Sequence, residues 1–154
     1  MVQEKNIQKY EAYRSMHEDL KKAMSAGFYF QAIFIEYAIL EDRLASVLKY
    51  ANVPYLTKSG RDVFISEKIK RIENRPELSS SFVKKRLSPE LLDSLNNWLS
   101  DRNDLIHHLA STPYDSERVR LVAEKGAEIC RQIKNKTDSV IRHYKSNRDQ
   151  DQKQ

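Results

Sequence analysis

The stretch FYFQAIFIEYAILEDRLASVLKYA, residues 28–51, decides the fold of this chain. Apolar residues recur in it at every third or fourth position, which is the spacing of one helix face. The principal members of this face are Ile33, Tyr37, Leu40, Leu44, Val47 and Ala51. Three further residues, Ile35, Ala38 and Ile39, widen it. A face of this width is typical of a helix with neighbours on several sides, so the stretch predicts the central helix of a bundle.

The segment before residue 28 has the same periodicity. Its apolar stripe consists of Tyr10, Tyr13, His17, Leu20 and Met24. Within this stripe, His17 is expected to be a packed, hydrogen-bonded side chain. We expect the helix to end at residues 25–27, because Gly27 can adopt the left-handed conformation common at helix C-termini. On the other side of the central helix, residues 52–60 contain Pro54 and Gly60, which predict a loop.

Three patterns follow the loop and extend to residue 99. Residues 61–74 predict a helix that places Phe64, Ile65, Ile69 and Ile72 together. Pro76 follows the end of this helix, and residues 77–86 predict a short helix or an ordered loop. Ser88 and Pro89 mark the next helix start, since serine caps a helix and proline suits its first position. The packing face of that helix is Leu91, Leu92, Leu95, Trp98 and Leu99.

The last helix is expected to begin after a cap formed by Asp115 or Ser116. Its apolar stripe, with a spacing of about 3.5 residues, is typical of packed helices. The stripe consists of Val119, Val122, Gly126, Ile129, Ile133, Thr137, Val140 and Tyr144. Because Gly126 lies within the stripe, we expect another helix to cross closely at this point.

Together these patterns predict an all-α protein, an up-and-down bundle of four to six helices. For a chain of 154 residues we expect one domain over residues 1–146, followed by a polar, disordered tail over 147–154. The single cysteine, Cys130, excludes an intramolecular disulfide and a cysteine-based metal cluster, and is expected to be a small buried residue. No segment has the roughly twenty apolar residues of a membrane-spanning helix. The polar N-terminal segment also lacks the apolar core of a signal peptide. We therefore expect a cytoplasmic protein without membrane contact.

Residues 100–109, SDRNDLIHHL, gather an arginine, an asparagine, two acids and two histidines. We expect Ser100 or Asp101 to cap a new helix that runs to Leu109 or Ala110. Positions four apart share a helix face. The expected pairs are Asn103 with His107, Asp104 with His108, and Leu105 with Leu109, the last pair pointing to the core.

Arginine, amide and imidazole groups in one turn suit chemistry on a phosphodiester. The guanidinium of Arg102 can bind two phosphate oxygens and stabilise a pentacoordinate transition state. An imidazole exchanges protons near neutral pH, and RNA supplies its own 2′-hydroxyl nucleophile. With RNA as the substrate, neither a metal nor another cofactor is required. The alternative from the residues alone is a solvated helix edge on which Asp104 and His108 form an ordinary surface pair.

Residues 102–107, RNDLIH, resemble the R-x(4–6)-H signature of the HEPN superfamily, the higher eukaryotes and prokaryotes nucleotide-binding domains. In that family a polar residue usually follows the arginine, and here it is Asn103. Residues 26–44, AGFYFQAIFIEYAILEDRL, resemble the early helix of the family. The resemblance covers most of residues 6–145. It implies a compact all-α bundle with the motif at the start of a late helix.

The resemblance implies a metal-independent endoribonuclease that acts as a homodimer, with two copies of the motif facing each other across a cleft. Arg102 would hold the scissile phosphate, and Asn103 would orient the phosphate or the histidine. His107 would be the general acid or base, although His108 also satisfies the spacing; we favour His107 because it shares a face with Asn103. The expected products carry 2′,3′-cyclic phosphate and 5′-hydroxyl ends.

Family members with this activity are commonly toxins, abortive-infection proteins or other defence nucleases, so an antitoxin is one expected partner. One branch is modified by a partner nucleotidyltransferase on a tyrosine two positions after the histidine. Leu109 and Ala110 stand at those positions here, so the sequence does not support this control. The alternative function is a catalytically silent HEPN-like module that binds a nucleotide or a partner protein. A purely structural bundle is the third possibility.

Other charged residues have two interpretations each. Glu36, Glu41 and Asp42 either orient Arg102 from the central helix or form a solvated face. The basic segments at residues 83–87 and 118–120 suit an RNA-contacting rim, in agreement with the net charge of +5, or an ordinary soluble surface. His143 near the end of the last helix is expected to have no function of its own.

Overall fold

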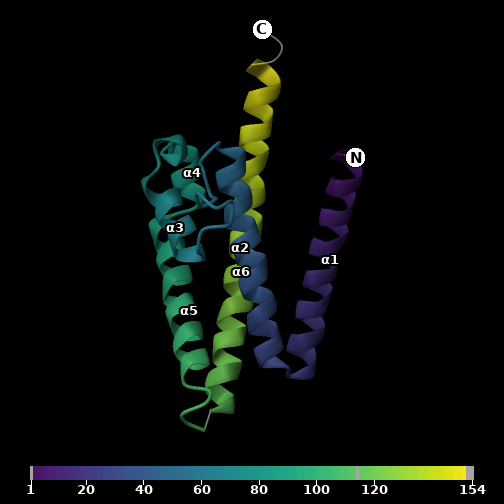
Figure 1. Ribbon diagram of the computed structural model, residues 1–154, viewed down its shortest axis with the longest axis vertical. Coiled ribbons are helices and arrows are strands. Elements are labelled where there is room, and N and C mark those ends of the chain that lie inside the picture. Colours follow the sequence, from purple (N-terminus) through teal and green to yellow (C-terminus); the bar gives the residue numbers. More distant parts are fainter. Residues whose placement is uncertain (1, 114, 152–154) are drawn as a thin grey trace. The chain divides into compact units, whose positions relative to one another are not determined.

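The computed structural model describes residues 2–113 and 115–151 (Figure 1). Within these ranges the α-helices are α1 (Val2–Ala26), α2 (Tyr29–Tyr50), α3 (Ile65–Asn74), α4 (Ser81–Arg86), α5 (Pro89–His107) and α6 (Ser116–Asp151). A single 3-10 turn, η1 (Pro76–Leu78), precedes α4. The strand-like pairing within the same ranges is one isolated antiparallel bridge between Leu56 and Asp62. The protein is therefore an all-α bundle, as the periodicity of the sequence predicts.

The chain forms two compact units. The first unit consists of Met1–Ile39 and Trp98–Cys130, and the second of Leu40–Asn97 and Arg131–Gln154. Three helices, α2, α5 and α6, contribute part of their length to each unit. The expectation of one domain over residues 1–146 stays a prediction.

A left-handed residue ends each of the first two helices. Gly27 follows α1 with φ 74°, and the amide of Phe28 donates to the carbonyl of Ala23 at 2.8 Å. Asn52 follows α2 with φ 57° and the same pattern of hydrogen bonds; asparagine tolerates this conformation better than most residues. The predicted end of the first helix is confirmed. The turn after Gly27 reverses the chain, so that the start of α2 lies beside the end of α1 (Figure 1).

The core-facing side of α2 agrees in most positions with the predicted face. Glu36 lies in the middle of the buried side. Its apolar neighbours there are Ala32, Ile33, Ile39, Leu40, Leu44, Val47 and Leu48. Ala38 is exposed, so its assignment to the core is wrong. Two helical residues span about 200° of rotation, which puts Ala38 opposite the buried position 36.

Gly126 is the point at which α6 approaches α2 and α5 in the first unit. A Cβ atom on Gly126 would lie 2.1 Å from Oε2 of Glu36 and 2.7 Å from Nε1 of Trp98. That Trp98 nitrogen donates a hydrogen bond to the carbonyl of Val122 at 2.9 Å. Only glycine fits this arrangement, so the predicted close crossing is confirmed.

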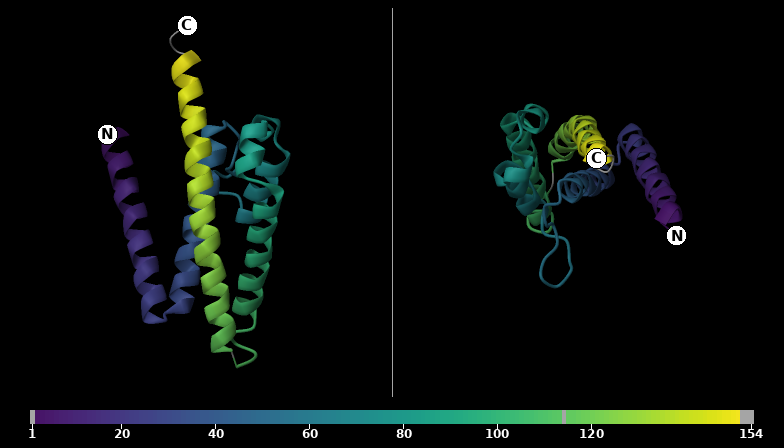
Figure 2. Two further views of the ribbon diagram at one scale, coloured as in Figure 1. Left: turned by 180° about the vertical axis from the view of Figure 1, so that it is seen from behind. Right: turned by 90° about the horizontal axis from the view of Figure 1, so that it is seen from above.

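In the second unit, the buried side of α3 includes a lysine that the sequence prediction did not place there. Lys68 of α3 is 0% exposed, and its ammonium donates to Asp62 at 2.8 Å and to Glu41 at 3.4 Å. Phe64, which was expected on the packing face, is 81% exposed. The reason is that α3 begins only at Ile65, and Phe64 has extended backbone before it. The loop before α3 extends away from the helices of this unit (Figure 2).

Two predicted helix boundaries are corrected. α5 continues from Pro89 to His107, so no new helix starts at Ser100 or Asp101. The apolar stripe of α5 continues in register from Trp98 to the buried Leu105, seven residues on, and nothing between them breaks a helix. Leu109 lies beyond the end of α5 and is 40% exposed, so it does not point to the core.

The last helix also extends further than expected. Residues 147–151, which the sequence assigned to a disordered tail, belong to α6. Arg148 holds this end of the helix, because its Nη2 donates to the carbonyl of Tyr50 at 2.7 Å and to the side chain of Asn52 at 2.8 Å. Residues 152–154 of the expected tail lie outside the described residues.

Candidate catalytic segment at the end of α5

Arg102 lies on the last turns of α5 in the first unit, against the aromatic residues of α2. Its Cζ is 4.6 Å from the ring centroid of Tyr37 and 5.8 Å from that of Phe34. Stacking on an aromatic face stabilises a guanidinium without neutralising it. Nη1 donates to Oδ1 of Asn103 at 2.9 Å, and the buried Nε has no hydrogen-bond partner within the described part of the chain. Within residues 2–113 and 115–151, Arg102 forms no ion pair.

Asn103 connects the arginine to the histidine side of the helix. It accepts the hydrogen bond from Arg102, and it lies four residues before His107, so it shares a face with that histidine. His107 is the last residue of α5 and is exposed. Arg102 and His107 are five residues apart, which separates their directions by about 140° around the helix. One copy of the segment therefore does not point both groups at a common atom.

His108 follows the end of α5 and is oriented by Asp104. Its Nδ1 is 3.3 Å from Oδ1 of Asp104 and 2.8 Å from the Asp104 carbonyl. The expected pairing of these two residues is confirmed. When Nδ1 carries the proton toward these oxygens, Nε2 is left as a proton acceptor facing away from them.

Asp104 also holds the end of α5 against the start of α6. Arg118 donates to Oδ2 of Asp104 at 2.5 Å, and Lys125 reaches Asp101 at 3.2 Å. The hydrogen bond from Arg118 lowers the pKa of Asp104 below its usual value, and the positive charge of the neighbouring histidines acts in the same direction. These bridges join α5 and α6 next to the connection between them (Figure 1).

A small pocket lies beside His108. Its volume is 110 Å³, and its lining includes Leu105, Thr112 and Arg118. This volume is well below the roughly 300 Å³ at which pockets for drug-sized ligands begin. The pocket suits a small group, such as one phosphate, and it is too small to enclose a nucleoside.

Glu36 is buried and has no charged partner among the described residues, which neither interpretation of the sequence anticipated. The residue is 0% exposed, and both of its carboxyl oxygens lack a hydrogen-bond partner within the described residues. Burial raises the pKa of Glu36 to about 9. A carboxyl group in this setting is neutral at physiological pH, because ionisation without a partner in the interior is costly. The adjacent Cys130 is buried as predicted, and burial raises the pKa of its thiol.

The other two acids of α2 do not orient Arg102. Glu41 binds the buried Lys68 in the second unit, and Asp42 binds Arg43 at 2.6 Å. The predicted basic rim is also partly neutralised. Arg118 is paired with Asp104. Arg120 is paired with Glu117 and Glu124, and these bonds raise its pKa.

The two remaining histidines pack against aromatic rings. His17 lies in edge-to-face contact with Tyr13, with ring centroids 4.6 Å apart. His143 stacks on Phe82 at 4.3 Å. The packing of His17 agrees with the sequence prediction, whereas the sequence indicated no packing role for His143.

Sequence reasoning missed the residues that support Arg102. Tyr37 had been assigned to the core face of its helix, and Phe34 had not been singled out. The available signal was their spacing of three residues, which puts both rings on one side of α2. No sequence pattern indicated the ion pair between Asp104 and Arg118, because the two residues lie on different helices.

Comparison with known proteins identifies no relative of this chain. No protein-family model, no curated protein and no solved structure matches this chain. Among the described residues, no helix is both long enough and apolar enough to cross a membrane. No group of three or more His, Cys, Asp or Glu residues in the same ranges is placed to hold a metal ion.

Proposed function

We propose that this protein is a HEPN-type endoribonuclease that cleaves RNA by attack of the 2′-hydroxyl, in a defence or toxin–antitoxin setting. The observation that carries the proposal is the state of Arg102. Its guanidinium is held on the ring of Tyr37 and by the amide of Asn103, and no ion pair within the described residues neutralises it. Three N–H donors on its terminal nitrogens remain for a ligand, since a guanidinium has five, one of them binds Asn103 and the Nε donor is buried. A phosphate diester supplies the matching acceptors and negative charge.

The histidines supply the proton transfer in this mechanism. A base takes the proton of the 2′-hydroxyl, the oxygen attacks the adjacent phosphorus, and an acid protonates the departing 5′-oxygen. His108 is held by Asp104, whereas His107 shares a face with Asn103. Each is a candidate for the acid or the base, and Arg102 stabilises the pentacoordinate phosphorus.

The separation of Arg102 and His107 around the helix favours a homodimer as the active form. Because one copy does not direct both groups at one atom, a second copy would complete the site with its own segment. Phe34, beside Arg102, exposes 57% of its surface, which suits a residue covered by a partner subunit. An antitoxin or another regulator would act by covering the same segment.

The test is cleavage of a labelled RNA by the purified protein in excess EDTA. We expect fragments with 2′,3′-cyclic phosphate and 5′-hydroxyl ends. Arg102→Ala is expected to slow cleavage at least about 100-fold, as is loss of the histidine that transfers the proton. His107→Ala and His108→Ala, made separately, decide between the two histidines. Arg61→Ala removes an exposed arginine from the loop before α3 and is the matched control, with cleavage unchanged.

The alternative is a catalytically silent module that binds a nucleotide or a partner protein through the same segment. The motif lies at the C-terminal end of α5, whereas the family resemblance implies the start of a late helix, and this difference favours the alternative. Intact RNA after incubation with a wild-type protein shown to be dimeric by sedimentation would establish the silent module. A monomeric protein with Arg102 fully solvated would leave only a structural bundle.

A further inference from the structure

A basic groove lies in the second unit, and none of its lining residues belongs to the segment described above. It runs between α4 and the adjoining part of α6 and has a volume of 630 Å³. Four cations line it, namely Lys85, Arg86, Arg131 and Lys136. The remaining lining side chains are amides and a hydroxyl, all of them neutral hydrogen-bonding groups. A cavity with four positive charges and no carboxylate in its lining is a site for an anion.

Three cations of this groove, Lys85, Arg86 and Lys136, are positioned rather than neutralised within the described residues. Arg86 lies 3.5 Å above the ring of Phe82, and its Nε donates to Oγ of Ser139 at 2.7 Å, so both contacts leave its charge intact. Lys85 and Lys136 are exposed, and neither of them forms an ion pair within the described residues. The acid nearest in sequence to Lys136 is Asp138, which is already bonded to two other cations of the second unit.

The spacing of the cations suits a polymer of phosphates better than a single anion. Arg131 and Lys136 are five residues apart, which is about 7.5 Å along α6. Charges follow one another at about 3.4 Å along one strand of a stacked nucleic acid, so the groove spans two or more phosphates. Lys85 and Arg86 stand on the opposite wall, on α4.

Two further features of the lining limit the chemical class of ligand that the groove can bind. No exposed aromatic ring lines the groove, so bases have no surface on which to stack there. No exposed large apolar residue lines it either; such residues within the described ranges belong to other segments. A membrane-binding surface needs apolar groups beside its cations. The lining is therefore suited to a sugar–phosphate backbone and not to bases or lipid.

We propose that this groove of α4 and α6 binds the backbone of single-stranded RNA, without reading its sequence. The inference rests on the proposed function in taking RNA as the polyanion, and it assigns substrate holding to residues other than Arg102. Phosphate contacts supply affinity that is independent of sequence and falls with salt.

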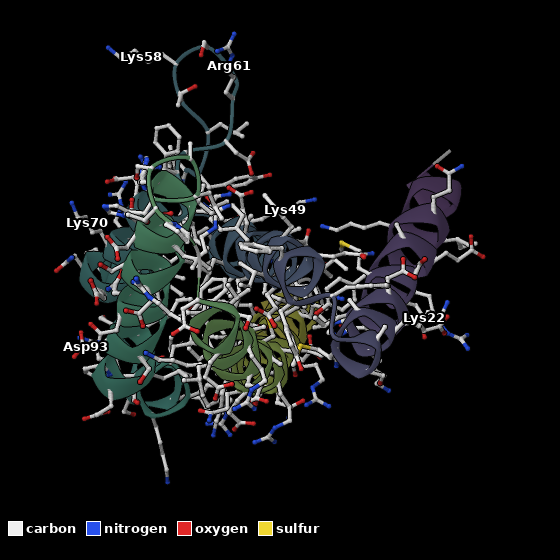
Figure 3. All side chains as sticks on the ribbon, turned by 90° about the horizontal axis from the view of Figure 1, so that it is seen from below. Lys22, Lys49, Lys58, Arg61, Lys70 and Asp93 are labelled. Carbon is white, nitrogen blue, oxygen red and sulfur yellow. The ribbon has the colours of Figure 1, made fainter. Side chains whose placement is uncertain are left out.

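The experiment measures binding of a fluorescent 2′-O-methyl RNA strand, which lacks the attacking hydroxyl, by anisotropy. The test variant is K85Q/K136Q. The matched control is K58Q/K70Q, which removes the same charge from the loop before α3 and from the outer side of α3 (Figure 3). At about 0.15 M salt each lost phosphate contact weakens binding about four-fold, so the test variant should bind about 15-fold more weakly. Its plot of log K against log salt should be shallower by about 1.4.

The control variant should bind within about two-fold of the wild type. Equal RNA affinity of K85Q/K136Q and the wild type overturns the inference. An equal loss of affinity in K85Q/K136Q and in K58Q/K70Q also overturns it, because binding would then depend only on the total charge of the protein. Binding to anionic lipid vesicles without binding to the RNA strand overturns it as well. All variants are checked for helix content by circular dichroism.

Cleavage of unmodified RNA separates this inference from the proposed function. Groove-dependent binding by a protein that cuts no RNA leaves the groove assignment in place and refutes the ribonuclease. Cleavage that is equally efficient in wild type and K85Q/K136Q leaves the ribonuclease in place and refutes the groove. If both proposals hold, the groove variant raises KM and leaves kcat unchanged.

Discussion

Replacement of Glu36 by glutamine tests whether the buried carboxyl group of Glu36 is protonated, and therefore neutral, in the folded protein. The side chain is 0% exposed, and within the described residues neither carboxyl oxygen has a hydrogen-bond partner. Burial raises its pKa from 4.5 to about 9. Between these two pH values, the folded protein holds a proton that the unfolded chain has lost. Stability therefore falls as the pH rises through this interval, because the folded state must either keep the proton or bury a charge.

The size of the effect follows from the shift. Each pH unit between the two pKa values lowers the free energy of unfolding by about 1.4 kcal/mol, so the wild type loses about 3 kcal/mol from pH 5.5 to pH 8 through Glu36. Glutamine does not ionise, and its amide contributes only a constant difference. Glu36→Gln should therefore gain about 3 kcal/mol on the wild type over this range.

Urea unfolding of both proteins at pH 5.5, 6.5 and 8 measures this difference, in which the effects of other titrating groups cancel. Glu11→Gln removes the same charge from an exposed position on α1 and is the control, since the gain should be specific for position 36. A difference between wild type and Glu36→Gln that does not change with pH would refute the reasoning, because the carboxyl group would then be solvated or paired.

Two further substitutions test the packing of each unit. Gly126→Ala should destabilise the protein by about 1–3 kcal/mol in thermal or urea unfolding despite the higher helix propensity of alanine, because its methyl group overlaps Glu36. In a Glu36→Ala background the same change should cost less, and an equal cost in both backgrounds would show that this contact is not the cause. In the second unit, Lys68→Met should cost at most about 1 kcal/mol, since the partly exposed Asp62 and Glu41 regain water. Removing both of those acids should cost about 3–5 kcal/mol because it leaves a buried ammonium unpaired, and the reverse order of these two effects in urea unfolding would contradict the assignment.

Local patterns account for the parts of the fold that the sequence predicted correctly. The helical stripes, the end at Gly27, the start at Ser88 and the tight crossing at Gly126 depend on periodicity and on the conformational range of single residues. The same reasoning failed at Phe64 and Ser100. A helix ends where its buried apolar stripe ends, and the stripe of α5 continues to Leu105. The few residues around Ser100 do not show whether that stripe is buried, so they do not fix the helix boundary.

The sequence likewise predicted one part of the candidate site and missed another. The sequence brought Arg102, Asn103 and the two histidines together, because they lie within two turns of one another. It did not reveal that Tyr37 supports the arginine, since that contact joins segments sixty-five positions apart.

The sequence by itself determined that the chain is helical, which faces are apolar, and which short segment concentrates groups suited to phosphate chemistry. These properties follow from the 3.6-residue period and from side-chain chemistry, both of which are local. Only the tertiary structure decided which charges are neutralised and which are not. Within the described residues, it paired Arg118 and Lys68 with acids, left the carboxyl group of Glu36 buried without a hydrogen-bond partner, and placed Lys85 and Lys136, which form no ion pair there, along one groove. Burial and charge pairing depend on which distant segments meet, and that is fixed only when the whole chain packs.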